Sequence, residues 1–146
     1  MKVKDILREK GPEVVTIWEE KTIQEAVAAM VRNKIGALMV LDDKSKITGI
    51  ISERDVLRVL NTKPVELSEI KVRDSMVRKV IIGDLEDTLE YIETIMTENK
   101  IRHIPIISEK RLVGIISIGD IVKTLSSSIK IENRYLKNYI QGKHGG

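Results

Sequence analysis

One seven-residue segment occurs twice in this chain. Residues 49–55 read Gly-Ile-Ile-Ser-Glu-Arg-Asp and residues 114–120 read Gly-Ile-Ile-Ser-Ile-Gly-Asp, so five of the seven positions are identical. Shorter matches precede the two copies, at residues 3–5 and 72–74, 14–16 and 80–82, and 33–35 and 99–101. Similarity at a fixed period is typical of a duplicated structural unit. The sequence therefore predicts two equivalent half-modules.

Each copy has the same apolar pattern. Apolar residues recur at helical spacing over residues 22–34, with Thr22 as N-cap, and again after Asp87 and Thr88. Short apolar runs separated by polar turns predict strands at 37–41, 47–51, 104–107 and 112–116, and further helices at about 53–60 and 118–125. With a first strand at 14–16 and at 80–82, the order is strand, helix, strand, strand, helix, twice. Gly83 and Asp84 predict that the first strand of the second copy ends early.

This order predicts an α/β (α+β) fold of two β-α-β-β-α repeats. Three short strands leave one apolar sheet face uncovered, so we expect the repeats to pack sheet to sheet about a pseudo-two-fold axis. The expected division is residues 1–62, residues 63–125 and a terminal segment, 126–146. Pro64 interrupts the helical pattern between the repeats. The terminal segment is expected to form a helix that packs on the body or on a second subunit.

The composition narrows the classes of function. The chain has 146 residues, of which 42% are hydrophobic, and a net charge of only +3 that is spread along the sequence. It has no cysteine, which excludes disulfides and thiolate chemistry. The sequence shows neither a signal peptide nor a long apolar run, so we expect a cytoplasmic protein with no membrane span.

The repeated Ser-x-x-Asp has two interpretations. At the start of a helix, Ser52 with Asp55 and Ser117 with Asp120 resemble capping boxes, and capping alone could explain them. The same position could also bind a nucleotide, because helix N-termini attract phosphate and a carboxylate can accept hydrogen bonds from both hydroxyls of a ribose. The glycine three residues before each serine would then allow a close approach.

The paired repeats, each with Gly-x-x-Ser-x-x-Asp near its end, resemble tandem cystathionine-β-synthase (CBS) domains, a Bateman module. Residues 14–16, 33–35 and 101–105 also fit this family pattern. The resemblance covers roughly residues 1–125. It implies adenosine-containing ligands in clefts between the repeats: AMP, ADP or ATP foremost, with NAD and S-adenosylmethionine as further members. It also implies a flat homodimer.

The resemblance also implies roles for individual residues. Asp55 and Asp120 would hold ribose, Ser52 and Ser117 would contact ribose or phosphate, and Arg54, Arg102 and His103 would contact phosphate. The backbone of Val14, Val15 and Thr16 and that of Val80, Ile81 and Ile82 would meet the adenine edge. The remaining members of the expected binding set are Ile35, Gly36, Ala37, Ile51, Ile101, Pro105 and Ile116. Because the two copies differ around these positions, the two clefts need not have equal affinity.

These features together predict a regulatory sensor that has no enzymatic activity and no metal site, and that acts on an unknown protein in trans. The only other histidine besides His103 is His144, so a histidine-based metal site or triad is not favoured. Three alternatives remain. The chain could be a nucleic-acid-binding regulator, an enzyme such as a phosphohydrolase, or a structural pair whose Ser and Asp only cap helices.

Overall fold

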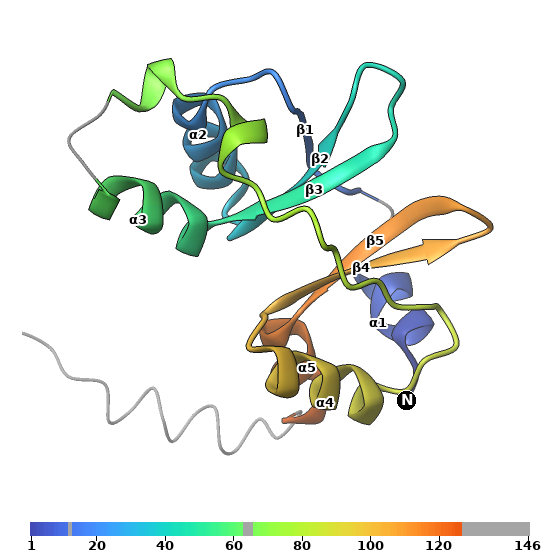
Figure 1. The fold of residues 1–146 in the computed structure, drawn as a ribbon. Coiled ribbons are helices and arrows are strands. Elements are labelled where there is room, and N and C mark those ends of the chain that lie inside the picture. The colour runs from blue at the N-terminus through green and yellow to red at the C-terminus, as the bar shows by residue number, and fades with distance from the viewer. Residues whose placement is uncertain (12, 63–65, 127–146) are drawn as a thin grey trace, which may run out of the picture.

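The computed structural model describes residues 1–11, 13–62 and 66–126. Figure 1 shows their arrangement, with the strands of both repeats in the middle of the molecule and the paired helices outside them. In chain order the elements are α1 (Val3–Lys10), β1 (Thr16–Trp18), α2 (Ile23–Asn33), β2 (Ala37–Leu41), β3 (Ile47–Ser52), α3 (Glu53–Thr62), the short 3-10 helices η1 (Leu67–Glu69) and η2 (Val72–Asp74), α4 (Leu89–Asn99), β4 (His103–Ser108), β5 (Arg111–Ser117) and α5 (Ile118–Leu125). The α+β fold of two repeats is confirmed. The predicted terminal helix lies almost wholly outside the described residues.

Local sequence signals start the long helix of each repeat. The Thr22 hydroxyl accepts a hydrogen bond from the Glu25 backbone N–H at 3.1 Å, which caps α2 as predicted. Thr88 caps α4 in the same way through the backbone N–H of Tyr91. Both helices end at a lysine in the left-handed conformation, Lys34 and Lys100. The two repeats therefore use the same start and stop signals.

The two sheets differ at their first strand. In the first repeat β1 is parallel to β2, which is antiparallel to β3. In the second repeat β4 and β5 form an antiparallel pair, and the strand predicted at residues 80–82 does not form. In this segment a single β-bridge forms, between Gly83 and Ile106. It corresponds to the pairing of Ile17 with Val40 in the first repeat. A Cβ at Gly83 would lie 3.0 Å from two isoleucine side chains, so the chain meets the sheet only at a residue without a side chain.

Strand β2 is covered on both faces. Leu38 and Val40 belong to the core of the first repeat, whereas Ala37 and Met39, which alternate with them, are buried outside that core. In the second repeat Ile104 and Ile106 face the core and the intervening Pro105 is also buried. Burial of both strand faces agrees with the predicted packing of the two sheets against each other in the centre of the molecule (Figure 1).

Each core is completed by the segment that leads into the other repeat. Val3 and Ile6 of α1, at the start of the first repeat in sequence, are buried in the core of the second. Val72 and Met76, near the start of the second repeat in sequence, are buried in the core of the first. Neither α1 nor this exchange was expected from the sequence. The division of the sequence between residues 62 and 63 stays a prediction. In the structure, each core contains residues from both sides of that division.

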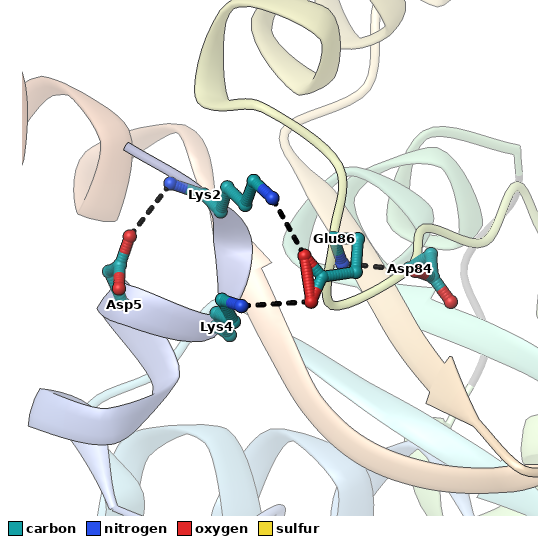
Figure 2. Close-up of polar contacts among 5 residues, drawn as sticks. All are labelled: Lys2, Lys4, Asp5, Asp84 and Glu86. Carbon is teal, nitrogen blue, oxygen red and sulfur yellow. Dashed lines mark hydrogen bonds and ion pairs between the residues drawn. The ribbon is translucent and has the colours of Figure 1, made fainter.

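The polar contacts of the two exchanged segments are equivalent. Glu86 pairs with Lys2 and Lys4, in each case at 2.8 Å, and Figure 2 shows this cluster between α1 and the loop before α4. The hydrogen bonds from both lysines lower the pKa of Glu86 to about 2. In the other half Glu20 pairs with Lys71 at 2.8 Å and Arg73 at 2.7 Å.

Backbone bonds fix the same register in both places. The Val3 N–H donates to the Asp87 carbonyl at 2.9 Å, and the Val72 N–H donates to the Lys21 carbonyl at 2.8 Å. The buried valine, the ion pairs and the backbone hydrogen bond therefore occur in both halves of the molecule. The exchange is thus part of the duplicated unit.

We predict that Ile6→Ala destabilises the protein by about 2–5 kcal/mol, because this side chain is 4% exposed and fills the second core. Urea unfolding checks the free energy of unfolding. Val31→Ala is the control, since Val31 is 73% exposed on α2 and its truncation should change little. A loss below about 0.5 kcal/mol for Ile6→Ala would contradict the inclusion of α1 in that core.

Candidate functional site

A cleft of about 560 Å³ lies between the two repeats. One wall is the junction of β3 and α3 in the first repeat, and the other is formed by the chain at 77–81 and 99–105. Half of the predicted binding set lines it: Gly36, Ser52, Arg54, Asp55, Val80, Ile81, Ile101, Arg102, His103 and Pro105. The volume is within the range of about 300–1,000 Å³ that is typical of small-molecule sites. The first Ser-x-x-Asp therefore faces residues of the second repeat across a space that a ligand can fill.

The Ser52–Asp55 pair forms a polar corner that two hydrogen bonds hold together. Asp55 Oδ2 accepts hydrogen bonds from the Ser52 N–H at 2.8 Å and from the Ser52 hydroxyl at 3.0 Å. The serine hydroxyl donates to the carboxylate, so Ser52 differs from an ordinary N-cap, whose hydroxyl accepts from the backbone. The corner holds a carboxylate in the first turn of α3, where the helix dipole favours a negative charge.

Arg58 covers this corner. Its guanidinium donates to Asp55 Oδ1 at 3.0 Å, and the Asp55 residue is only 2% exposed. The Arg58 side chain itself is 62% exposed. Arg58 was not in the predicted set, although its place three residues after Asp55 on a helix is the ordinary spacing for such a pair.

Cationic groups from both repeats meet in the cleft. Arg54 and Arg58 come from α3, and Lys79, Lys100 and Arg102 come from the second half of the chain. The Arg54 guanidinium donates to the Lys100 carbonyl at 3.1 Å and so joins the two walls. Glu53 and Asp55 are the acidic lining residues, and the cleft therefore carries a net positive charge.

His103 lies at the start of β4 on the same cleft. Glu53 occupies the space above Gly36, where an added Cβ would collide with its carboxylate and would lie 3.5 Å from His103 Cε1. Burial lowers the pKa of His103, and the nearby Glu53 charge opposes that shift without reversing it. Gly36 thus permits a carboxylate beside the imidazole.

The second Ser-x-x-Asp is arranged differently. The Ser117 hydroxyl accepts from the Asp120 N–H at 3.1 Å, and Asp120 Oδ2 accepts from the Ser117 N–H at 2.8 Å, which is the predicted capping box. Lys10, at the end of α1, pairs with Asp120 at 2.9 Å. Burial raises the pKa of Asp120, but the hydrogen bonds from Ser117 and Lys10 outweigh it and leave the pKa below its ordinary value.

Comparison with known proteins identifies the family. The family model for the CBS domain matches residues 3–62 and 68–127. The chain belongs to the CBS domain family. A curated relative, the mitochondrial CBS domain-containing protein CBSX3 of Arabidopsis thaliana, is 33% identical over 96% of this chain and 72% of its own length. The solved structure of the CBS-domain containing protein ATU1752 from Agrobacterium tumefaciens has a TM-score of 0.82 and 35% identity, with 85% of this chain and 92% of that chain covered.

A further structure is the CBS domain pair of protein MJ0100, solved in complex with 5-methylthioadenosine and S-adenosyl-L-methionine. It has a TM-score of 0.76 and covers 87% of this chain and 97% of that chain. At 24% identity it shows the shared fold.

The other half of the predicted set does not line the cleft between the CBS repeats. Its members are Val14, Val15, Thr16, Ile35, Ala37, Ile51, Ile82, Ile116, Ser117 and Asp120. Ile51 and Ile116 are fully buried in the two cores, and Ala37 is buried on β2. Ile51 and Ile116 each precede the signature serine on their strand and so point to the face opposite to it.

The glycine three residues before each serine allows a close approach of protein atoms, whereas a ligand was expected there. A Cβ at Gly49 would lie 2.7 Å from Met76 Sδ and from the Val77 carbonyl oxygen, and one at Gly114 would lie 2.5 Å from Leu7 Cδ2. The close approach is made by the exchanged segments of the protein itself, so these glycines leave no space for a ligand.

Residues 1–11, 13–62 and 66–126 contain no group of three or more metal-ligating side chains. Within the same ranges no helix has the length and apolar character needed to span a bilayer.

We predict that His103 makes the protein less stable as the pH falls from 7.5 to 5.5. An unfolded histidine takes up a proton near pH 6.5, whereas the native pKa of His103 is lower, so the unfolded state binds the proton first. The contribution is present above pH 6.5 and is lost as the pH falls through the native pKa. His103→Gln should flatten this loss, measured as the free energy of unfolding in urea at each pH. A loss of stability in this variant as steep as that of the wild type would contradict the prediction.

Proposed function

We propose that this CBS pair is a regulatory module that binds one adenosine-containing ligand in the cleft at Asp55. The observation that carries the proposal is the position of the Ser52–Asp55 corner, which faces Arg102 and His103 of the other repeat across about 560 Å³. A buried carboxylate on one wall and cations on the other provide what a nucleoside with a charged substituent requires.

The ligand would be oriented by its three parts. The ribose hydroxyls would donate to Asp55, and the adenine would lie against Ile50 and the chain at Val80 and Ile81. A phosphate would reach Arg54 and Arg102, since guanidinium groups match phosphate oxygens in geometry. The ligand class is AMP, ADP, ATP, NAD or S-adenosylmethionine.

Binding of a ribose requires Arg58 to move. Asp55 already accepts three hydrogen bonds, and a carboxylate has about four acceptor positions, so a diol with two hydroxyls competes with the guanidinium. Arg58 is exposed enough to leave without disturbing the core. Its release in the cleft would add a cation near the phosphate.

The complex of the MJ0100 CBS pair with two adenosine derivatives supports this ligand class, because that protein shares the fold. The cleft offers the residues for binding and orienting a nucleotide, and the module would carry out no reaction on it. Unchanged nucleotide after incubation with the protein is the expected result of a product assay.

The signal would arise from the two walls of the cleft. A ligand that touches both repeats favours the arrangement in which it binds best, and it shifts the population by its difference in affinity. Leu57 and Leu60 on α3 and Val122 and Leu125 on α5 are at least half exposed, which suits a homodimer through these helices. A partner protein in the cytoplasm would then recognise the ligand-bound arrangement.

We predict that AMP, ADP or ATP raises the melting temperature, and that a ligand at 100 times its dissociation constant adds about 2.7 kcal/mol to the free energy of unfolding. Asp55→Asn should weaken binding by about tenfold or more, because it removes a charged acceptor for the ribose. Isothermal titration calorimetry measures affinity apart from the stability that the variant also loses.

The control is Asp43→Asn, which alters an exposed turn aspartate that does not line the cleft and should bind like the wild type. If no adenosine compound binds, the proposal fails. Affinity for single-stranded RNA or DNA that falls steeply with salt would instead favour the nucleic-acid alternative.

A further inference from the structure

Two lysines occupy equivalent positions in the duplicated unit. Lys10 lies seven residues after Val3, and Lys79 lies seven residues after Val72, its counterpart in the second repeat. The same register is seen in the packing, because Leu7 lies over Gly114 and Met76 lies over Gly49. The repeat therefore brings one lysine to each Ser-x-x-Asp.

Lys10 is fully engaged within the protein. Its ammonium donates to Asp120 Oδ2 at 2.9 Å and to the Ile115 carbonyl at 2.8 Å. Its charge is thus balanced by the signature aspartate of the second repeat.

Lys79 does not make the equivalent contacts, and other donors occupy the two corresponding groups. The Ile50 carbonyl, counterpart of that of Ile115, accepts from the Val77 N–H at 2.9 Å. Asp55 Oδ1 accepts from Arg58 at 3.0 Å. Lys79 lines the cleft, is exposed, and forms no ion pair with any residue that the structure describes.

The difference has a cause in the backbone. Residues 3–10 form a continuous helix, whose N–H groups beyond the first turn bond within the helix. The chain after Asp74 leaves the short helix η2 and lays Val77 against Ile50 as a bridge. Lys10 therefore reaches acceptors within the protein, whereas the equivalent Lys79 lies at the cleft.

We propose that Lys79 binds a phosphate group of the ligand and that this cleft selects phosphorylated adenosine compounds over uncharged or cationic ones. The inference rests on the proposed function and names the class of ligand within it. The lysine adds to the positive charge of Arg54, Lys100 and Arg102 around the cleft. Cations that converge without a counter-ion repel one another, and a phosphate removes that repulsion while an uncharged adenosine does not.

The test is calorimetric titration of the full chain with ATP, AMP, adenosine and S-adenosylmethionine. Wild type should bind ATP and AMP at least tenfold more tightly than adenosine and S-adenosylmethionine. Lys79→Ala should lose about tenfold or more of the affinity for ATP, as expected for a hydrogen bond between charged groups, and should keep its affinity for adenosine.

Lys10→Ala is the matched control, since it removes the same residue from the same place in the other half. Its affinity for ATP in the cleft at Asp55 should equal that of wild type. Equal affinity of wild type for adenosine and ATP, or equal losses in the two lysine variants, would overturn the inference and leave the proposed function standing. Binding of none of the four compounds would overturn the proposed function and the inference with it.

Discussion

The exchange of segments between the two repeats is the constraint on which the rest of the structure depends. Val3 and Ile6 complete the second core and Val72 and Met76 complete the first, so neither repeat has a full core of its own. The glycine that precedes each serine by three positions makes room for these segments. Because the exchanged chain passes directly beside the Ser-x-x-Asp corner, the element that stabilises the fold also forms a wall of the cleft.

Duplication has produced two similar corners with unequal surroundings. Both aspartates are held by the backbone N–H of their serine and both are paired with a cation, Arg58 in one case and Lys10 in the other. Lys10 comes from a distant segment of the chain, whereas Arg58 lies on the same helix as its partner. The carboxylate in the cleft is therefore covered by one exposed side chain of its own helix.

Much of the local structure could be predicted from the sequence, because strand length, capping residues and apolar spacing are local properties. The strand at 37–41 and the caps at Thr22 and Thr88 are examples. The exchange could not, since it brings together segments that are far apart in the sequence, which no local pattern specifies. Residues 80–82 resemble a strand in composition, yet only Gly83 reaches the sheet. Ten of the predicted site residues line the cleft. Arg58 and Lys79 also line it and were missed, although the spacing of Arg58 after Asp55 on a helix was a usable signal, whereas the place of Lys79 depends on how the chain after Asp74 crosses to the other repeat.

A crystal structure of the full chain grown with saturating AMP would test the central claim most directly. The account predicts AMP in the cleft at Asp55, with both ribose hydroxyls on the carboxylate, Arg58 released from it and the phosphate beside Arg102. AMP bound at Asp120 in place of Lys10, with Asp55 still covered by Arg58, would contradict it.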